Sequence, residues 1–544
     1  MTPLTSALVA LAALVALAGA THRLLHVFQQ EHYEPARLRR WVGQAPRARL
    51  ALAEAALALA AGAAAALAAG ASGAVAVVLA AAAVGAAAWR AQATWRRPQI
   101  KPLVFTPRAR RLLGAQLALA AVALAAVAAL AGDRAWAPAA VGALGAALLL
   151  AAPWLLADVA NTLLRPVQAA DNRRFVRRAE RRLAQVRPLV IGITGSYGKT
   201  TTKACAAAVF DLLGDAYPTP ASFNSHLGVV RAINEGLEPR HRSFVVEMGA
   251  YRRGDVRELC ELVHPQVGII TAIGPAHLER FGSLDVTEQA KGELAEALPP
   301  DGLLVTRADD PRCVRIARTR TRARTLLFAP APHPDADVWA QDVRMRDGRT
   351  HFTLVARTGG PTGAGVERAE VRARLLGEHN VANLVAAAAA ALGQGLAIAD
   401  VARALGRVEP PAHRLAPIVN RAAGVVVIDD SYNANPEGAA AALAVLAAHP
   451  ARRRLLVTPG MVELGERERE ENRRLGERAA PVADLALLIG ARGADVAAGM
   501  RAAGAPEERI RLLPDGPAAH AALAQLTRPG DVILFVNDLP DVYA

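Results

Sequence analysis

The sequence predicts a chain of three parts, with an α-helical membrane region over residues 1–165 and two α/β domains over residues 186–412 and 413–544. The first third of the chain is composed largely of Ala, Leu and Val in long blocks, whereas the rest has a more mixed composition. The rest alternates short apolar runs with helical stretches, a pattern typical of α/β domains. A chain of 544 residues is also too long for one ordinary hydrophobic core.

Five apolar segments in the first part are each long enough to cross a bilayer, which takes about 20 helical residues. The block 50–88 is about twice that length and has small residues at Gly70–Gly73, so it is predicted to form a helical hairpin. The other predicted spans are Leu4–Ala20, Leu112–Ala131 and Ala137–Val159. A bundle of buried Ala-rich helices in a soluble protein is the alternative interpretation.

Basic residues are concentrated in alternate loops between these spans. The first and third loops hold six and seven Lys and Arg side chains, whereas the second and fourth contain only Arg134. The positive-inside rule therefore places the basic loops and both α/β domains in the cytoplasm, with the N-terminus outside. We expect a multi-pass protein of the inner, or cytoplasmic, membrane. A cleaved signal peptide ending near Ala20 is the alternative for the first span, although no positive charge precedes it.

The net charge of +14 does not require a nucleic-acid partner, because much of it lies beside the predicted spans. The stretch RRFVRRAERR, residues 173–182, is an example. Membrane lipids with anionic headgroups are the partner that this position predicts. Cys205, Cys260 and Cys313 form no C-x-x-C pair, which fits a reducing compartment and argues against a metal–thiolate site.

A phosphate-binding loop is predicted in TGSYGKTT, residues 194–201. The apolar run before it predicts a strand and the segment after it a helix, and backbone N–H groups at such a helix N-terminus bind phosphate. Lys199 would reach the terminal phosphates and Thr200 would bind Mg²⁺. The usual loop has Gly where this chain has Ile193, so only a shorter form is present, and a plain Gly-rich turn is the alternative. The candidate nucleotide-binding residues are Gly195, Ser196, Gly198, Lys199, Thr200 and Thr201.

Further motifs follow this loop. They are VVEMGAYRRGDV from Val245, IGPAHLERFGS from Ile273, EQAKGEL from Glu288, LLGEHNVANL from Leu375 and DDSYNANP from Asp429. With the short loop and in this order, they resemble the Mur ligases, which build the peptide stem of bacterial cell-wall precursors. SYNANP and FNSHLGV are similar to motifs of the branch that adds D-alanyl-D-alanine to a UDP-linked muramoyl tripeptide. The resemblance covers residues 188–535 and does not reach the first 165.

The resemblance implies ATP-dependent amide formation, with a P-loop ATPase-like central domain and a Rossmann-like C-terminal domain. ATP would phosphorylate a carboxylate, an amine would attack the acyl phosphate, and ADP and phosphate would leave. Because this brings anionic groups together, bound Mg²⁺ and a cationic Lys would lower the barrier. The implied partners are a small-molecule or lipid-linked cell-wall precursor and an amine donor.

The resemblance further implies a metal site beside Thr200. Glu247, at the end of the predicted strand SFVVE, and His277 would bind Mg²⁺. Lys291 is similar to a Lys that CO₂ carbamylates, which requires its neutral amine. Lys199, His277 and Lys291 are the implied catalytic residues. The alternatives are an exposed acid at Glu247, a structural His277, and a helix-surface Lys291 paired with Glu288 or Glu293.

The remaining implied site residues surround the nucleotide and the substrate. Asn380 and Asn383 would bind adenine, with helix capping by Asn380 as the alternative. Arg414 would approach the phosphates from a hinge, and Asp429 would bind the ribose. The implied substrate-cleft residues are Asn224, Tyr432, Asn433 and Asn435. Three apolar runs beyond the hinge, RRLLVTPG, DLALLIG and DVILFV, predict a second open parallel sheet.

The chain departs from the resembled family in two places. Membrane spans stand where the branch has its UDP-binding domain, and LFVNDLPDVYA replaces a Lys-Gly-Ser turn after the last strand. The first hypothesis is a membrane-anchored ligase of the D-alanyl-D-alanine-adding type. A ligase making another amide, on a lipid-linked precursor or a γ-glutamyl polymer, and a non-enzymatic ATP-binding scaffold are the alternatives. No role is predicted for Tyr197 in the loop.

Overall fold

The computed structural model describes residues 2–30, a few positions between 33 and 39, and residues 103–537 except 135, 152–155, 276–280, 347, 359–364, 432–433 and 463. The chain divides into two compact units, which meet in sequence between Arg173 and Arg174. The first unit is helical, and the second contains both β-sheets.

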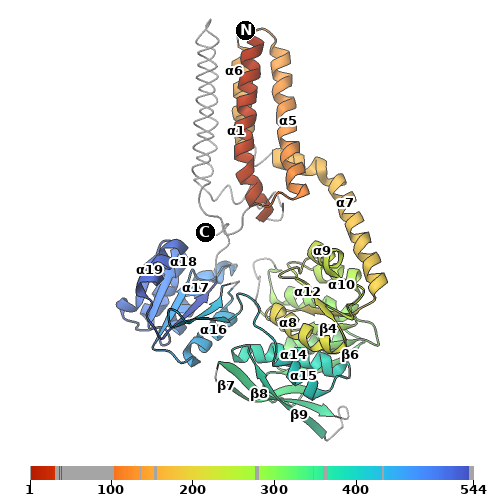
Figure 1. The fold of residues 1–544 in the computed structure, drawn as a ribbon. Coiled ribbons are helices and arrows are strands. Elements are labelled where there is room, and N and C mark those ends of the chain that lie inside the picture. Colours follow the sequence, from red (N-terminus) through yellow and green to blue (C-terminus); the bar gives the residue numbers. More distant parts are fainter. Residues whose placement is uncertain are drawn as a thin grey trace. The chain divides into compact units, whose positions relative to one another are not determined.

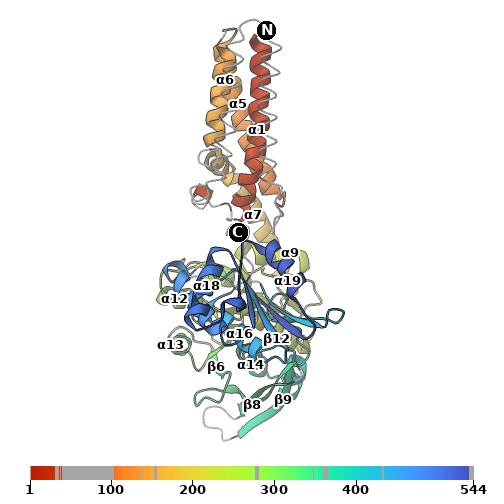
Figure 2. The same ribbon diagram turned by 90° about the vertical axis from the view of Figure 1, so that its left-hand side faces the viewer.

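The helical unit is built from α1 (Thr2–Gln30), α5 (Pro107–Ala131), α6 (Ala137–Ala151) and the first half of α7 (Ala157–Val186). Figures 1 and 2 both show α1, α5 and α6 running side by side. Their apolar side chains, including Phe28 and Leu124, form one buried cluster. Thr106 caps α5 by accepting a hydrogen bond from Ala109 N.

Within the described part of the chain, α5 is the one helix long and apolar enough to cross a membrane. Its outward residues are apolar, with Val122 70% and Leu130 79% exposed. The predicted span Leu4–Ala20 lies inside α1, and the predicted hairpin at 50–88 lies outside the described residues.

The predicted span over residues 137–159 coincides with α6, which ends at Ala151, and with the beginning of α7 at Ala157, while residues 152–155 lie outside the described residues.

The middle domain contains a nine-stranded sheet in the order β2-β3-β1-β4-β5-β6-β7-β8-β9. Its parallel strands are β1 (Leu189–Thr194), β2 (Ala216–Pro218), β3 (Ser243–Glu247), β4 (Val267–Ile270), β5 (Leu303–Arg307) and β6 (Arg324–Ala329), and β7 (Val338–Arg346) pairs parallel to β6. The helices α8 (Lys199–Phe210), α14 (Glu378–Gly393) and α15 (Ile398–Leu405) share one core with the sheet. The other core involves α9 (His226–Gly236), α10 (Asp255–Val263), α12 (Leu284–Ala297) and α13 (Pro311–Thr319).

The predicted α/β character of this domain is confirmed, but its antiparallel part was not predicted. The strands β7, β8 (Arg349–Thr358) and β9 (Gly365–Ala373) form an antiparallel meander at the sheet edge. The connection between β7 and β8 contains Gly348 at a φ of +68°, a conformation that glycine adopts without strain.

The C-terminal domain contains a six-stranded sheet in the order β10-β11-β15-β12-β13-β14. Its strands are β10 (Ala416–Asn420), β11 (Val425–Asp430), β12 (Arg453–Thr458), β13 (Leu485–Ile489), β14 (Ile510–Leu513) and β15 (Asp531–Val536), and its helices are α16 (Pro436–Ala448), α17 (Glu468–Ala479), α18 (Gly490–Ala502) and α19 (Gly516–Leu526). The predicted open parallel sheet is confirmed from β11 onwards. The edge strand β10 is an addition, antiparallel to β11.

Candidate functional site

The phosphate-binding loop connects β1 to α8, and two glycines determine its path. Gly195 and Gly198 have φ angles of +147° and +77°, which side chains other than glycine rarely adopt. A Cβ at Gly195 would lie 1.9 Å from Thr271 Oγ1, and one at Gly198 would lie 2.1 Å from Asn383 Oδ1. Glycine is therefore required at both positions by conformation and by space.

The residues between these glycines are fixed to the segment that follows β4. Ser196 N donates to Ala272 O at 2.8 Å, and Ser196 Oγ donates to Gly274 O at 2.9 Å. The Tyr197 ring lies against Gly274, where an added Cβ would come within 2.5 Å of Tyr197 Cε2. The Tyr197 hydroxyl is buried without a hydrogen-bond partner among the described residues. Tyr197 thus packs against the loop's support and leaves one polar atom unsatisfied.

Lys199 lies in the first turn of α8 and folds back over the loop, where its Nζ donates to Gly195 O at 2.8 Å. Burial lowers the pKa of Lys199, Glu247 partly opposes this effect, and Arg414 adds to it. The next residue, Thr200, makes no side-chain hydrogen bond with a described residue, whereas Thr201 is buried. The Thr200 hydroxyl is therefore available to a ligand.

Glu247 is the last residue of β3 and is only 2% exposed. Its Oε1 accepts a hydrogen bond from Asn224 Nδ2 at 3.0 Å. Its Oε2 lies 3.1 Å from Lys203 Nζ but accepts no hydrogen bond from the described residues. Burial alone would raise the pKa of Glu247, but the charges of Lys203 and Lys199 outweigh burial and lower it. Glu247 is thus a buried, ionised carboxylate, and the alternative of an exposed acid is wrong.

Lys203 was not predicted as a site residue, yet it is the cation that balances Glu247. It lies one helical turn after Lys199, is 6% exposed, and donates to Ala221 O at 2.6 Å. The spacing of four residues in a helix places both lysines on one face, which is the signal that could have identified it.

Lys291 lies in α12 and is 3% exposed. Its Nζ is 5.8 Å from the centre of the Phe281 ring and makes no hydrogen bond or ion pair with a described residue. The pairing with Glu288 or Glu293 that we considered is wrong. Glu288 pairs with Arg312 and Arg315, and Glu293 accepts hydrogen bonds from two backbone N–H groups of the segment 254–257.

Burial lowers the pKa of Lys291 well below its usual range, and the charge of Lys199 adds to this effect. The neutral amine of Lys291 is therefore favoured, as carbamylation requires. His277, the other predicted metal ligand after β4, lies outside the described residues.

Asn380 and Asn383 lie in the first two turns of α14, and Asn383 contacts the phosphate-binding loop at Gly198. Asn383 Nδ2 donates to Asn380 Oδ1 at 2.9 Å, and Asn383 Oδ1 accepts from Thr202 Oγ1 at 3.1 Å. Asn380 Nδ2 donates to Leu376 O at 2.7 Å. Asn380 does not cap the helix, because the N-cap is Gly377. Each amide retains one N–H for a ligand, so adenine binding stays a prediction.

The hinge between the two domains has a strained backbone around Arg414. His413 and Leu415 have positive φ angles of 60° and 50°, which are unfavourable for residues other than glycine. His413 Nδ1 lies 2.7 Å from Asp429 Oδ2, and Ser431 Oγ donates to Asp429 Oδ1 at 2.6 Å. Both oxygens of Asp429 are therefore engaged within the domain, and its predicted contact with ribose is untested.

The predicted substrate-cleft residues are divided between the two domains. Asn224 contacts Glu247, whereas Asn435 caps α16 by accepting a hydrogen bond from Gly438 N at 2.9 Å. Tyr432 and Asn433 lie outside the described residues.

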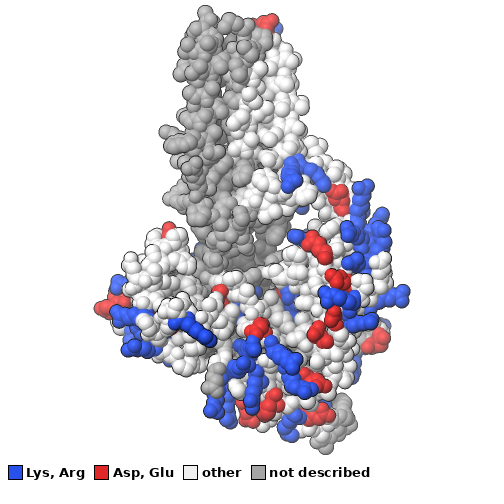
Figure 3. Space-filling view, in the orientation of Figure 1, with Lys and Arg blue, Asp and Glu red and all other residues white. Residues whose placement is uncertain are grey.

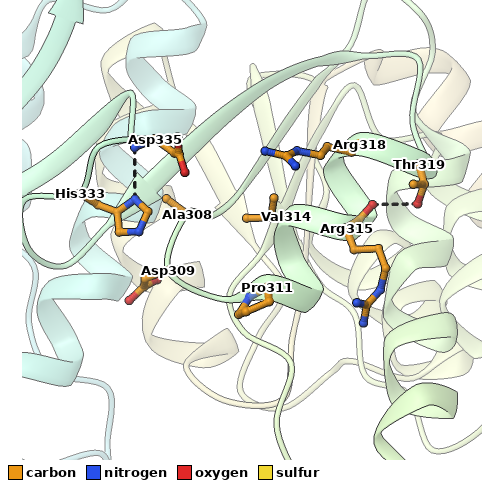
Figure 4. A pocket seen from close by; sticks show the side chains of 9 residues that line it. All are labelled: Ala308, Asp309, Pro311, Val314, Arg315, Arg318, Thr319, His333 and Asp335. Atoms are coloured by element: carbon orange, nitrogen blue, oxygen red, sulfur yellow. Dashed lines mark hydrogen bonds between the residues drawn. The ribbon is translucent and has the colours of Figure 1, made fainter.

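A cavity of about 480 Å³ lies beyond the ends of β5 and β6, as Figure 4 shows. It is lined by α13 and by the loop that carries His333 and Asp335. None of the predicted site residues lines it, and its Arg315 is already paired with Glu288. The chemistry-bearing residues that the fold does bring together are Lys199, Lys203, Glu247 and Lys291. Lys203 and Lys199 supply positive charge beside the buried carboxylate of Glu247, and the buried amine of Lys291 is affected by the charge of Lys199, an arrangement suited to binding phosphate and a divalent metal.

Comparison with protein families identifies both sheet domains. Residues 193–391 match the Mur ligase middle domain, and residues 413–537 match the Mur ligase glutamate ligase domain.

Among relatives, the UDP-N-acetylmuramoyl-tripeptide–D-alanyl-D-alanine ligase of Mycobacterium tuberculosis is 36% identical over 370 residues, which are 63% of this chain and 69% of that protein. The enzyme of the same name from Escherichia coli is 32% identical over 307 residues, 56% of this chain and 65% of that one.

Solved structures give the same result. MurF from Acinetobacter baumannii has a TM-score of 0.58 and 28% identity, covering 68% of this chain and 77% of that one. MurF from Thermotoga maritima, in complex with ADP, has a TM-score of 0.58 and 25% identity, covering 68% and 80%. The predicted resemblance is confirmed, and the chain belongs to the Mur ligase family.

Proposed function

We infer that the protein is an ATP-dependent ligase that joins D-alanyl-D-alanine to the peptide of a muramoyl-tripeptide precursor. The observation that carries this inference is the buried ion pair of Lys203 and Glu247 beside Lys199 of the phosphate-binding loop, in a middle domain whose named relatives catalyse that ligation. A scaffold that only binds ATP has no need of a buried carboxylate flanked by two lysines, here Lys203 and Lys199.

The reaction that fits this site proceeds in two steps. The terminal carboxylate of the tripeptide attacks the γ-phosphorus of ATP, which breaks the bond to the leaving oxygen of ADP and gives an acyl phosphate. The amine of the dipeptide then attacks the acyl carbon, loses a proton, and displaces phosphate. Lys199 and the backbone N–H groups of the loop stabilise the negative charge on the transferred phosphoryl group.

The residues present fit Mg²⁺. Glu247 offers a buried carboxylate whose Oε2 has the ammonium of Lys203, 3.1 Å away, as its described neighbour, and the Thr200 hydroxyl makes no hydrogen bond with a described residue. Carboxylate and hydroxyl oxygens are ligands that Mg²⁺ prefers. Glu247 and Thr200, with His277, would hold the ion, which when bound would neutralise phosphate charge.

Ligase activity is tested with purified full-length protein in detergent, ATP, Mg²⁺, UDP-linked muramoyl tripeptide and D-alanyl-D-alanine. ADP release that requires both tripeptide and dipeptide supports the function. ADP release with another carboxylate or amine would instead favour a ligase making a different amide. That second function is favoured by LFVNDLPDVYA, which replaces the family's usual turn after the last strand.

Lys291 is proposed to be carbamylated: its neutral amine adds to CO₂ and releases a proton, giving an anion near the metal ligands. Lys291→Ala should lose activity, and a short-chain carboxylate such as acetate should restore part of it. Full activity of Lys291→Ala without added carboxylate would exclude this role. A mass increase at Lys291 in bicarbonate buffer is a readout independent of activity.

The helical unit is proposed to anchor the enzyme in the inner membrane, with both catalytic domains in the cytoplasm and the N-terminus outside. The apolar, outward-facing side chains of α5 and the alternating basic loops support this proposal. A reporter fused after Asn161 should be active in the cytoplasm, and a periplasmic signal would overturn the orientation. Anchoring would keep the enzyme beside lipid-linked as well as soluble precursors.

A further inference from the structure

The helical unit contains a cavity that the ligase reaction does not use. It has a volume of about 330 Å³ and lies between the N-terminal end of α5 and the first half of α7. Three arginines, three side-chain amides and three apolar residues line it, and no acidic residue does. The arginines are Arg108, Arg111 and Arg165, and the amides are Asn161, Gln168 and Asn172.

We propose that this cavity binds the phosphate-bearing headgroup of a membrane lipid. The proposal rests on the membrane location proposed above and concerns a site separate from the ligase site.

The charge state of the three arginines supports an anionic ligand. Arg165 is exposed and makes no ion pair or hydrogen bond with a described residue. The Arg108 guanidinium lies 4.2 Å from the centre of the Tyr33 ring, so an aromatic face orients it without neutralising it. Arg111 Nη1 lies 2.5 Å from Asp171 Oδ2, and Arg111 is the one lining arginine with a carboxylate partner among the described residues. Two guanidinium groups therefore remain for phosphate oxygens, which they bind in bidentate fashion.

The amides and the apolar residues define the chemistry around that charge. Gln168 Nε2 donates to Asn172 Oδ1 at 2.9 Å, which fixes two amides along one face of α7. Amides of this kind suit the hydroxyl and ester oxygens of a headgroup. Leu112 and Leu164 add an apolar wall, as expected where a headgroup joins its acyl chains. The volume suits a headgroup and not a whole lipid.

The position of the cavity agrees with this ligand. Arg108 and Arg111 lie in the first turns of α5, the helix whose length and hydropathy suit a membrane span. The end of such a helix lies at the depth of lipid headgroups. In Figure 3, the described surface of the apolar helices is white along most of its length, and blue side chains gather beside α7. Basic pockets at the cytoplasmic ends of spans bind anionic headgroups in other membrane proteins.

The test uses native mass spectrometry of the full-length protein in detergent, with added phosphatidylglycerol, phosphatidylcholine or a polyprenyl diphosphate. Tighter retention of either anionic lipid than of phosphatidylcholine is expected, and the tighter one identifies the source of the phosphate. Equal retention of all three lipids would overturn the proposal. So would inorganic phosphate alone, if it raised the thermal midpoint as much as the lipids do.

Matched variants locate the site. Arg165→Gln should weaken binding of the anionic lipid by about tenfold, since it removes a charged hydrogen-bond donor. Arg110→Gln is the control, because Arg110 is exposed on the same turn as Arg108 but does not line the cavity. A similar loss in both variants, or no loss in Arg165→Gln, would overturn the site.

Two further readouts keep the proposals apart. Arg165→Gln should retain ligase activity on soluble substrates, because Arg165 touches no predicted catalytic residue. A periplasmic reporter signal would overturn the proposed orientation; if the reporter agrees but lipid binding is unselective, only the cavity proposal fails.

Discussion

The predicted ligand-binding residues of the two sheet domains differ in the contacts that they already make within their own domain. In the middle domain, predicted charged residues are buried, with Glu247 2% and Lys291 3% exposed, and Lys203 supplies the counter-charge. In the C-terminal domain, Asp429 and Asn435 already use their oxygens in contacts within their own domain. The middle domain is thus arranged for phosphate and metal by its own packing. The C-terminal residues must exchange local hydrogen bonds for ligand contacts, so the same kind of substitution should have unequal effects in the two domains.

The largest effect is expected for Glu247→Gln. The amide keeps the size of the side chain but removes the charge that Mg²⁺ requires. We expect kcat to fall by about 10²–10³-fold, the usual effect of losing one electrostatic stabiliser. Glu235→Gln is the control, because Glu235 is exposed and paired with Arg231 on the surface. A loss of less than threefold in Glu247→Gln would show that Glu247 is not a metal ligand.

Lys203→Met should be the most destabilising change in this group. It leaves the buried carboxylate of Glu247 without its ion-pair partner, which typically costs about 3–5 kcal/mol. The thermal unfolding midpoint measures the effect. The double variant Lys203→Met, Glu247→Gln should recover most of the loss, because no charge is then left unpaired. A double variant as unstable as Lys203→Met alone would contradict the pairing.

Asp430 should make the stability of the C-terminal domain depend on pH. Burial raises its pKa to about 6, with Asp429 adding to the rise and Arg414 opposing it. The folded state therefore holds the proton more tightly than the unfolded chain, so this contribution to stability is present below about pH 4 and is lost as the pH rises to about 6. The loss amounts to about 3 kcal/mol. In the Asp430→Asn variant, the thermal unfolding midpoint should depend less on pH over this range. An unchanged pH dependence would contradict the prediction.

Two tyrosines should respond to loss of the hydroxyl in opposite directions. Tyr197→Phe removes a buried hydroxyl without a partner among described residues, and should raise stability by up to about 1 kcal/mol. Tyr217→Phe removes a hydroxyl that donates to Ala232 O at 3.1 Å, and should lower stability by about 1 kcal/mol. Loss of ligase activity in Tyr197→Phe would mean that the hydroxyl finds its partner in the substrate-bound enzyme.

The smallest effect is expected at the hinge. His413→Ala frees Asp429 Oδ2 from its contact with the exposed imidazole. The KM for ATP should fall by no more than about threefold, because exposed ion pairs contribute little. His449→Ala, which removes a half-buried imidazole elsewhere in the domain, should leave KM unchanged. A rise in KM for His413→Ala would show that His413 itself supports nucleotide binding.

The structure could be predicted from the sequence where a local pattern of apolar residues and a motif occur in the same segment. Strand, glycine loop and helix around Lys199 were predicted because apolar runs and glycines are local features. Lys203 was missed because its partner Glu247 lies on β3, distant in sequence, and the spacing of four residues from Lys199 shows a shared helix face but not that pairing. The meander β7–β9 was not predicted because none of the motifs lies within these three strands. The polar contacts of Asp429 were missed because the hinge backbone, with positive φ at His413, brings them together.

The alanines of α14 have a consequence for how this site can change. Residues 386–391 are all alanine and fully buried, so the helix lies close to the strands and to α8. Such a surface has no spare volume, and a larger side chain there would displace the whole helix. Asn383, on the same helix, would then move away from Gly198. The position of the phosphate-binding loop therefore depends on a helix segment that has no reactive side chain. Substitutions in that segment should be tolerated least, although the segment takes no part in the reaction.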